Sequence, residues 1–209
     1  MELTYGRYLK VEELLQLQQP LSEGPEHDEM LFIIIHQVYE LWFKQILHEL
    51  EKLKSSFQEG ERGKALHTLK RIRSILKVLV SQVDVLETMT PLEFLSFRER
   101  LQSASGFQSC QFRELEFTLG LKNPKHLEHY PQGSEERSRL EKKMEEPSLW
   151  EVFLQFLSSL GHDSPKLKEG GRPSEPPDSS EDIQDLLEKI YRNHSDSALV
   201  CEMLTDLDE

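Results

Sequence analysis

The sequence contains few cysteines and no long apolar run. Its 209 residues include two cysteines, Cys110 and Cys201, without CxxC spacing, so we expect free thiols and a reducing compartment. The longest apolar run, Met30 to Ile35, is far shorter than the ~20 residues of a membrane-spanning helix. The N-terminus also lacks the apolar core of a signal peptide. We therefore expect a cytoplasmic protein with no membrane partner.

Positive charge is also scarce. The chain has 25 Lys and Arg residues against 38 Asp and Glu residues, which gives a formal net charge of -13 at pH 7. A chain of this charge is repelled by the phosphate backbone of nucleic acids, and it contains no glycine-rich phosphate-binding loop. Nucleic acid is therefore not an expected partner.

Apolar residues recur at intervals of three and four along most of the chain, and strand signals are weak. This spacing predicts an all-α helical bundle. Two long helices, 27–57 and 62–88, are joined by a short turn at Glu59-Gly60 and should pack antiparallel. Thr90-Pro91-Leu92-Glu93 is a capping box that predicts another helix start. Further helices are expected at about 8–18, 107–119, 135–145, 149–160, 181–191 and 197–207.

The chain reads as one domain with a loose connection. Residues 1–161 form its main helical part, and residues 181–209 add C-terminal helices to the same domain. The stretch 162–180 is rich in Pro, Gly, Ser and charge, so it is predicted to be a mobile linker loop.

Two polar residues stand out beside apolar helical stretches. His36 lies within a strongly apolar helix, where it is either a core histidine bonded to a neighbouring helix or a group presented to a buried ligand. Arg98 is either a surface charge or a clamp for a carboxylate, which its planar guanidinium can bind with two hydrogen bonds. The residues alone leave both alternatives open.

Two further segments are less specific. The loop Ser105-Gly106 is either an ordinary interhelical turn or a place where backbone approaches a ligand closely. Tyr5 and Tyr8, in LTYGRYL, are aromatic residues of the kind that anchor a terminal tail on a core.

Five segments, in order, resemble the tryptophan 2,3-dioxygenase family. They are LTYGRYLKVEELLQLQQP, HDEMLFIIIHQVYELWFKQILHELE, LVSQVDVLETMTPLEFLSFRERL, SASGFQSCQFRELEFTLGLKNP and EPSLWEVFLQFL. Several long matches in one order are far more specific than a single short motif. The resemblance implies a helical homotetramer that binds haem b and uses O2 to open the indole ring of L-tryptophan, giving N-formylkynurenine in the kynurenine pathway.

The resemblance also implies a role for each matching residue. His36 corresponds to the histidine that hydrogen-bonds the indole nitrogen, and Arg98 to the arginine that binds the substrate carboxylate. The pocket wall is implied to include Phe32, Ile33, Ile34, Ile35 and Phe94. Ser105 and Gly106 match the loop over the haem edge and substrate, and Tyr5 and Tyr8 match residues that reach a neighbouring subunit's active site.

The family's haem-ligating histidine follows the segment matching CEMLTDLDE, as does a loop that holds the substrate ammonium group. Both are expected beyond Glu209, so the chain reads as C-terminally truncated and no metal ligand is assigned within it. Two hypotheses follow. The first is a haem-dependent dioxygenase, although the activity of this chain by itself is doubtful. The second is a non-catalytic helical homologue that associates with other subunits.

Overall fold

The computed structural model describes residues 2–24, 26–164 and 181–207. Within these residues all regular elements are helices and none is a strand, which confirms the all-α prediction. None of the described helices is both long and apolar enough to cross a bilayer.

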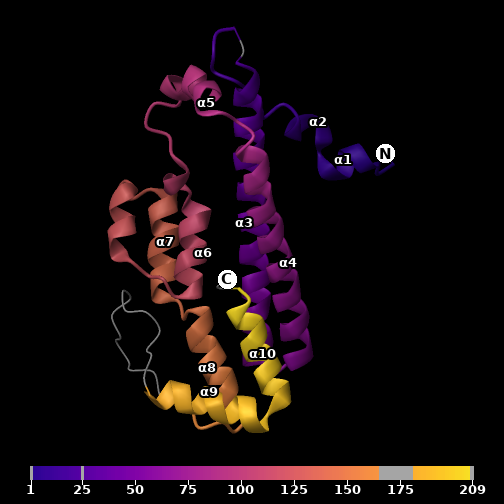
Figure 1. Ribbon diagram of the computed structural model, residues 1–209, viewed down its shortest axis with the longest axis vertical. Helices are drawn as coiled ribbons and strands as arrows, with labels where there is room; N and C mark the ends of the chain where they lie inside the picture. Colours follow the sequence, from indigo (N-terminus) through magenta and orange to yellow (C-terminus); the bar gives the residue numbers. More distant parts are fainter. Residues whose placement is uncertain (1, 25, 165–180, 208–209) are drawn as a thin grey trace.

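Two long helices, α3 (His27–Gln58) and α4 (Arg62–Leu86), form an antiparallel pair along most of the length of the molecule (Figure 1). Their direction is fixed by three contacts. Gln82 donates to the carbonyl oxygen of Ile35 at 3.1 Å, the Tyr39 hydroxyl donates to that of Leu79 at 2.8 Å, and Arg71 pairs with Glu49 at 2.9 Å. Residue numbers rise along one helix as they fall along the other. The predicted bounds of both helices hold to within two residues.

The main core lies where the C-terminal half of α3 and the paired part of α4 meet three later helices. These are α8 (Leu149–Ser159), α9 (Glu181–Asn193) and α10 (Ser195–Thr205). Phe57 of α3 stacks near Phe153 and Phe156 of α8, with ring centroids 5.7 and 4.9 Å apart. All three rings are buried, so this contact joins the C-terminal end of α3 to α8.

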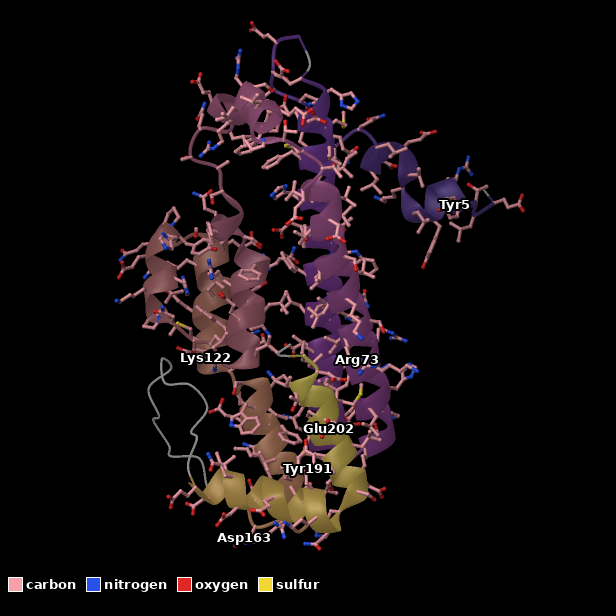
Figure 2. The ribbon with its side chains drawn as sticks, in the orientation of Figure 1. Tyr5, Arg73, Lys122, Asp163, Tyr191 and Glu202 are labelled. Atoms are coloured by element: carbon pink, nitrogen blue, oxygen red, sulfur yellow. The ribbon has the colours of Figure 1, made fainter. Side chains whose placement is uncertain are left out.

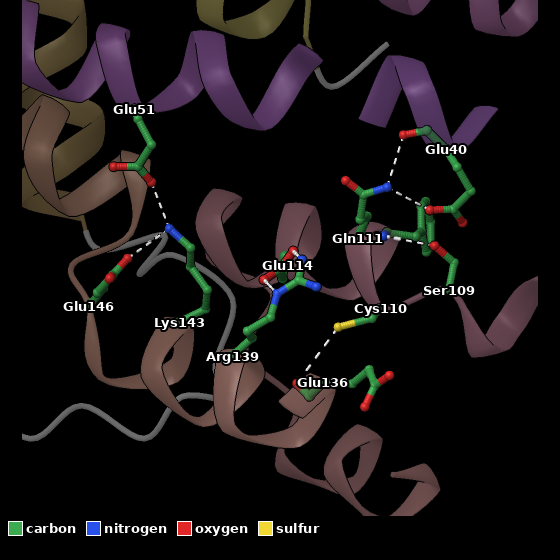
Figure 3. Close-up of polar contacts among 11 residues, drawn as sticks. Glu40, Glu51, Ser109, Cys110, Gln111, Glu114, Glu136, Arg139, Lys143 and Glu146 are labelled. Carbon is green, nitrogen blue, oxygen red and sulfur yellow. Dashed lines mark hydrogen bonds and ion pairs between the residues drawn. The ribbon is translucent and has the colours of Figure 1, made fainter. Parts of the chain in front are cut away.

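A second layer is formed by α6 (Cys110–Leu119), η3 (Pro124–His129) and α7 (Glu135–Glu145) around a small core of Phe117, Tyr130 and Leu140. Figure 3 shows the polar contacts that hold this layer. Arg139 of α7 makes two hydrogen bonds, of 2.9 and 2.6 Å, to the buried carboxylate of Glu114. The Gln111 amide donates to both the carbonyl and the carboxylate of Glu40, which ties α6 to the middle of α3.

Helix α5 (Pro91–Arg98) packs across the N-terminal half of α3, at the end of the molecule away from the main core (Figure 1). Its predicted capping box is confirmed. Thr90 N–H donates to the Glu93 carboxylate at 2.7 Å, and Glu93 N–H donates to the Thr90 hydroxyl at 3.4 Å. A 3-10 turn, η1 (Glu99–Leu101), follows α5 directly.

The predicted helix start at Phe107 is wrong. Residues Gly106–Gln108 form a 3-10 turn, η2, and α6 begins at Cys110. The reason is a second N-cap, because the Ser109 hydroxyl accepts a hydrogen bond from Phe112 N–H at 3.1 Å. The small polar residues therefore extend the connection three residues further than expected.

The first helix is also mispredicted. Instead of one helix over 8–18, the chain forms two short ones, α1 (Tyr5–Leu9) and α2 (Val11–Leu14). Lys10 separates them with a left-handed φ of 53°, a conformation that no α-helix continues through. Neither helix has a buried residue, and both extend away from the rest of the molecule as an N-terminal arm (Figures 1 and 2).

The arm is fixed to the body at its root, 17–22. The Glu29 carboxylate in the first turn of α3 accepts hydrogen bonds from Leu21 N–H at 2.7 Å and from Ser22 N–H at 3.1 Å, and also from the Ser22 hydroxyl. Gln37 exchanges further hydrogen bonds with Gln18 and the Leu17 carbonyl. The arm therefore leaves the body at a defined point on α3.

The predicted linker, 162–180, falls mostly outside the described residues, which include only its first three positions. C-terminal helices are present as predicted, although α10 begins at Ser195 instead of Ser197. The predicted free thiols are confirmed for both cysteines.

Replacing Glu29 by Gln should destabilise the protein by about 1–3 kcal/mol at pH 7, because the buried carboxylate that accepts the hydrogen bonds of Leu21 and Ser22 loses its charge. Burial raises the pKa of Glu29, but the hydrogen bonds from Ser22 and Leu21 outweigh this effect and hold the pKa below 4.5. A carboxyl group whose pKa is lower in the folded than in the unfolded protein stabilises the fold at pH values above its unfolded pKa. This stabilisation is lost as the pH falls through the pKa of the folded state.

The measurement is urea unfolding of the wild type and the Glu29→Gln variant from pH 7 down to pH 3, with Glu26→Gln, at an exposed position, as the matched control. We expect the difference in the free energy of unfolding between wild type and Glu29→Gln to become smaller below about pH 4.5. If this difference in the free energy of unfolding stays constant from pH 7 to pH 3, the charge of Glu29 does not contribute to stability.

Candidate active site

The ring of His36 lies against Phe32, one helical turn earlier on α3. The two ring centroids are 4.1 Å apart, and His36 Nδ1 lies 2.7 Å from the Phe32 carbonyl oxygen. A carbonyl oxygen only accepts hydrogen bonds, so Nδ1 carries the proton of this bond. In the neutral ring Nε2 then keeps its lone pair and can accept a hydrogen bond from a ligand.

Helix α5 brings two more aromatic rings to Phe32. The Phe94 and Phe97 ring centroids lie 5.9 and 5.6 Å from that of Phe32 and 5.5 Å from each other. Phe97 is fully buried, whereas Phe94 and His36 are partly exposed. The three phenylalanines, together with His36, form a cluster that we call the aromatic cluster.

Arg98 follows Phe97 directly and lies one turn after Phe94, so Phe94 and Arg98 share a face of α5. Its side chain is exposed, and Nη1 donates to the Gln102 carbonyl at 3.1 Å. A guanidinium has five N–H donors, so this bond leaves donors for a carboxylate. The structure thus places Arg98 next to the aromatic cluster, at a position open to a ligand.

Ser105 and Gly106 lie in the exposed connection between η1 and α6. The Ser105 hydroxyl accepts from Phe107 N–H at 3.3 Å, and Ser105 N–H donates to the Gln108 side chain at 3.2 Å. These bonds give the turn a defined shape. No contact joins the turn to the aromatic cluster, and its ligand-binding role stays a prediction.

The remaining predicted wall residues, Ile33, Ile34 and Ile35, point in different directions. Successive helical residues are turned by about 100°, so three in a row cannot face one cavity. Ile35 is buried and its carbonyl oxygen accepts from Gln82, whereas Ile34 is 43% exposed. Phe32 and His36, four residues apart, share the face toward α5.

Tyr5 and Tyr8 are distant from the aromatic cluster within this chain. Both lie on the N-terminal arm with 79% and 73% of their surface exposed (Figure 2). The arm also exposes Leu3, Leu9, Leu15 and Leu17. The tail-anchor interpretation, in which these tyrosines pack on the chain's own core, is therefore wrong.

Two residues that support the site were missed from the sequence. Phe97 is the ring that joins α5 to α3, and its spacing of three from Phe94 on a capped helix is a signal that could have identified it. Gln82 supports the turn of α3 that precedes His36, through its bond to the Ile35 carbonyl. Nothing local to residue 82 indicates this contact, because it depends on the pairing of α3 with α4.

The fold and the aromatic cluster define an all-α protein that presents a histidine, held through its Nδ1, and an arginine beside phenylalanine rings, at one end of a long helix pair. Such a set suits an aromatic ligand that carries a hydrogen-bond donor and a carboxylate.

Comparison with known proteins agrees with a site for an aromatic ligand that carries a carboxylate. The family model of tryptophan 2,3-dioxygenase matches residues 1–174. A tryptophan 2,3-dioxygenase of Herpetosiphon aurantiacus is 52% identical over 207 residues, which cover 99% of this chain and 79% of that protein. Those of Anaeromyxobacter sp. and Xanthomonas oryzae pv. oryzae are 51% and 41% identical, with 99% of this chain and 77% and 70% of theirs covered. The chain belongs to the tryptophan 2,3-dioxygenase family.

Proposed function

We propose that this chain provides the substrate-binding side of a haem-dependent site that converts L-tryptophan and O2 to N-formylkynurenine. The observation that carries the proposal is the aromatic cluster, with His36 fixed as a hydrogen-bond acceptor and Arg98 one residue beyond the buried Phe97. Family membership supports the same reaction.

In this proposal His36 Nε2 accepts the indole N–H. Its partner Phe32 holds the ring in one tautomer, so the acceptor is in place before the substrate arrives. The indole ring packs against the partly exposed Phe32 and Phe94, which the buried Phe97 supports from behind, and edge and offset contacts between aromatic rings are favourable. Arg98 binds the carboxylate and so sets the direction in which the amino acid enters.

Haem b, when bound, supplies the iron at which O2 is activated. The aromatic surface of α3 and α6 suits an apolar macrocycle, because Phe43 and the partly exposed Phe112 lie with ring centroids 5.6 Å apart along the same side of α3 as Phe32. Ser105 and Gly106 would hold its edge. We assign the iron ligand to none of the histidines in this chain.

The N-terminal arm supports assembly as part of the function. Its exposed tyrosines and leucines are not buried against the chain's own body. We propose that Tyr5 and Tyr8 complete the site of a neighbouring subunit in a homotetramer. This exposed apolar surface also favours the second candidate function, a non-catalytic subunit partner.

The first test is formation of N-formylkynurenine from L-tryptophan by the haem-supplied chain in air. Replacing Arg98 by Gln should raise the KM for L-tryptophan about 10–100-fold, because charge-assisted hydrogen bonds contribute about 1.5–3 kcal/mol each. Arg100→Gln, two residues further along, is the matched control and should leave KM unchanged.

Binding of tryptamine, which lacks the carboxylate, gives the discriminating measurement. Tryptamine should bind wild type and Arg98→Gln equally. If the substitution weakens tryptamine as much as tryptophan, Arg98 does not act on the carboxylate. Absence of both haem uptake and product formation in the wild type would instead favour the non-catalytic partner.

Replacing His36 by Ala should lower kcat/KM for L-tryptophan by about 10-fold or more and leave haem binding intact, because the proposed bond is to the indole and not to iron. 1-Methyl-L-tryptophan has no indole N–H, so the wild type should discriminate against it and the variant should not. The measurements are haem titration and kcat/KM for both substrates. Loss of haem from His36→Ala would make His36 an iron ligand.

Two impaired variants, assayed at a tryptophan concentration far below the raised KM of Arg98→Gln, should restore activity when mixed, if the arm acts on a neighbour. Tyr5→Ala/Tyr8→Ala lacks a functional arm but keeps Arg98, whereas Arg98→Gln keeps the arm. Mixed oligomers contain sites with an intact pocket and an intact arm, so product formation should exceed the sum of the separate rates. Rates that merely add would place the arm's action within its own subunit or outside catalysis.

A further inference from the structure

His162 and His194 meet at the end of the molecule opposite α5, although α9 and the preceding connection separate them in sequence. His162 follows α8, and His194 lies between α9 and α10 (Figure 1). Their ring centroids are 4.6 Å apart with the rings nearly perpendicular, at 81°. Neither histidine belongs to the proposed tryptophan site.

The pair borders two cavities of about 430 and 270 Å³, both lined by His162 and His194. The larger cavity is also lined by Asp163, which Figure 2 marks beside α9, and by Asp182, Asp185 and Lys189. The smaller one is lined by Arg62, Asp196 and the serines that begin α10. A ligand in either cavity can therefore reach both imidazoles.

The His162 ring is held in place by a hydrogen bond to Ser197. Its Nε2 lies 3.1 Å from the Ser197 hydroxyl, and Ser197 is buried. If Nε2–H donates to Ser197, Nδ1 keeps its lone pair. Histidines that bind metal ions are fixed in this way by a hydrogen bond from the other ring nitrogen.

The charges around the pair favour a cation over an anion. Three carboxylates face one ammonium group in the larger cavity, and Arg62 in the smaller one is paired with Asp196 at 2.9 Å. The chain as a whole carries a net charge of -13. Neutral imidazoles select transition metals such as zinc, copper and nickel, whereas Mg²⁺ and Ca²⁺ prefer oxygen ligands.

The spacing of the rings also fits one shared ion. An ion about 2.1 Å from a nitrogen of each ring lies about 3.2 Å from each centroid, so adjacent ligands place their centroids about 4.5–5.2 Å apart. The His162–His194 pair, at 4.6 Å, is within this range. The other close pair, His126 and His129, is outside it at 6.4 Å.

We propose that His162 and His194 form a binding site for a divalent transition-metal ion of the zinc class. Among residues 2–24, 26–164 and 181–207, no group of three or more His, Cys, Asp or Glu side chains is placed to hold a metal ion, so this site has two protein ligands. In this proposal, water molecules fill the remaining coordination positions, and the aspartates that line the larger cavity accept hydrogen bonds from these water molecules. His194, the more exposed ring, rotates to bring a nitrogen to the ion.

A bound ion ties the end of α8 to the α9–α10 junction. These segments belong to the main core, so occupancy stabilises the folded chain by mass action. The site is independent of the proposed dioxygenase reaction, which uses the opposite end of the molecule.

The experiment is calorimetric titration of the purified full chain with ZnCl2 and, separately, MgCl2, together with melting temperatures in each metal. We expect one equivalent of Zn²⁺ to bind with a micromolar Kd and to raise the Tm by a few degrees, and no effect of Mg²⁺. Binding should weaken as pH falls, because protons compete for the imidazole nitrogens.

His194→Asn removes one ligand from an exposed position, and His129→Asn removes a histidine from the other pair as the matched control. His194→Asn should weaken Zn²⁺ binding at least 10-fold and abolish the Tm rise, with an unchanged circular dichroism spectrum. His129→Asn should bind like the wild type. Absence of zinc binding to the wild type, or equal binding by all three proteins, would overturn the proposal.

Discussion

The packing of α3 against four other helices is the constraint on which the rest of the structure depends. Helices α4, α5, α6 and α8 each contact it. Two glutamines from different helices donate to its carbonyl oxygens, Gln82 to Ile35 and Gln111 to Glu40, at 3.1 and 2.9 Å. These bonds fix both the position and the rotation of α3. Because His36 lies between their two acceptors, they also fix where the imidazole points.

The two ends of α3 serve different purposes. Its C-terminal half contributes Leu50, Leu53 and Phe57 to the main core, where side chains are fully buried. Its N-terminal half packs against α4, α5 and the root of the arm, is bonded to α6 through Glu40, and leaves His36 and Phe32 partly exposed. Burial of apolar surface stabilises a fold, so the rings that remain partly exposed, Phe32 and Phe94, offer apolar surface that a ligand can cover.

Much of the fold follows from local sequence. The bounds of α3, α4 and α7, and the capping box at Thr90, were predictable because apolar spacing and capping residues act over a single turn. The start of α6 was misplaced because Phe107 and Ser109 both fit a helix start, and the hydroxyl of Ser109 provides the better cap. The break at Lys10 carries no such signal, since lysine rarely adopts a positive φ.

The candidate site was predictable only in part. The family motifs identify Phe32, His36, Phe94 and Arg98, and the structure brings the first three together around Phe97. It leaves the loop at Ser105 and the arm at Tyr5 apart from them, as expected if other chains or segments complete the site.

By itself the sequence determined the helical class, the bounds of α3, α4 and α7, and the family, because periodicity, caps and long motifs depend on residues that are neighbours in the chain. Only the tertiary structure decided that the His36 ring is held by the Phe32 carbonyl, that Phe97 joins α5 to α3, and that His162 meets His194. Each of these depends on a distance between atoms, and such distances are set by how whole helices pack and not by spacing along the chain.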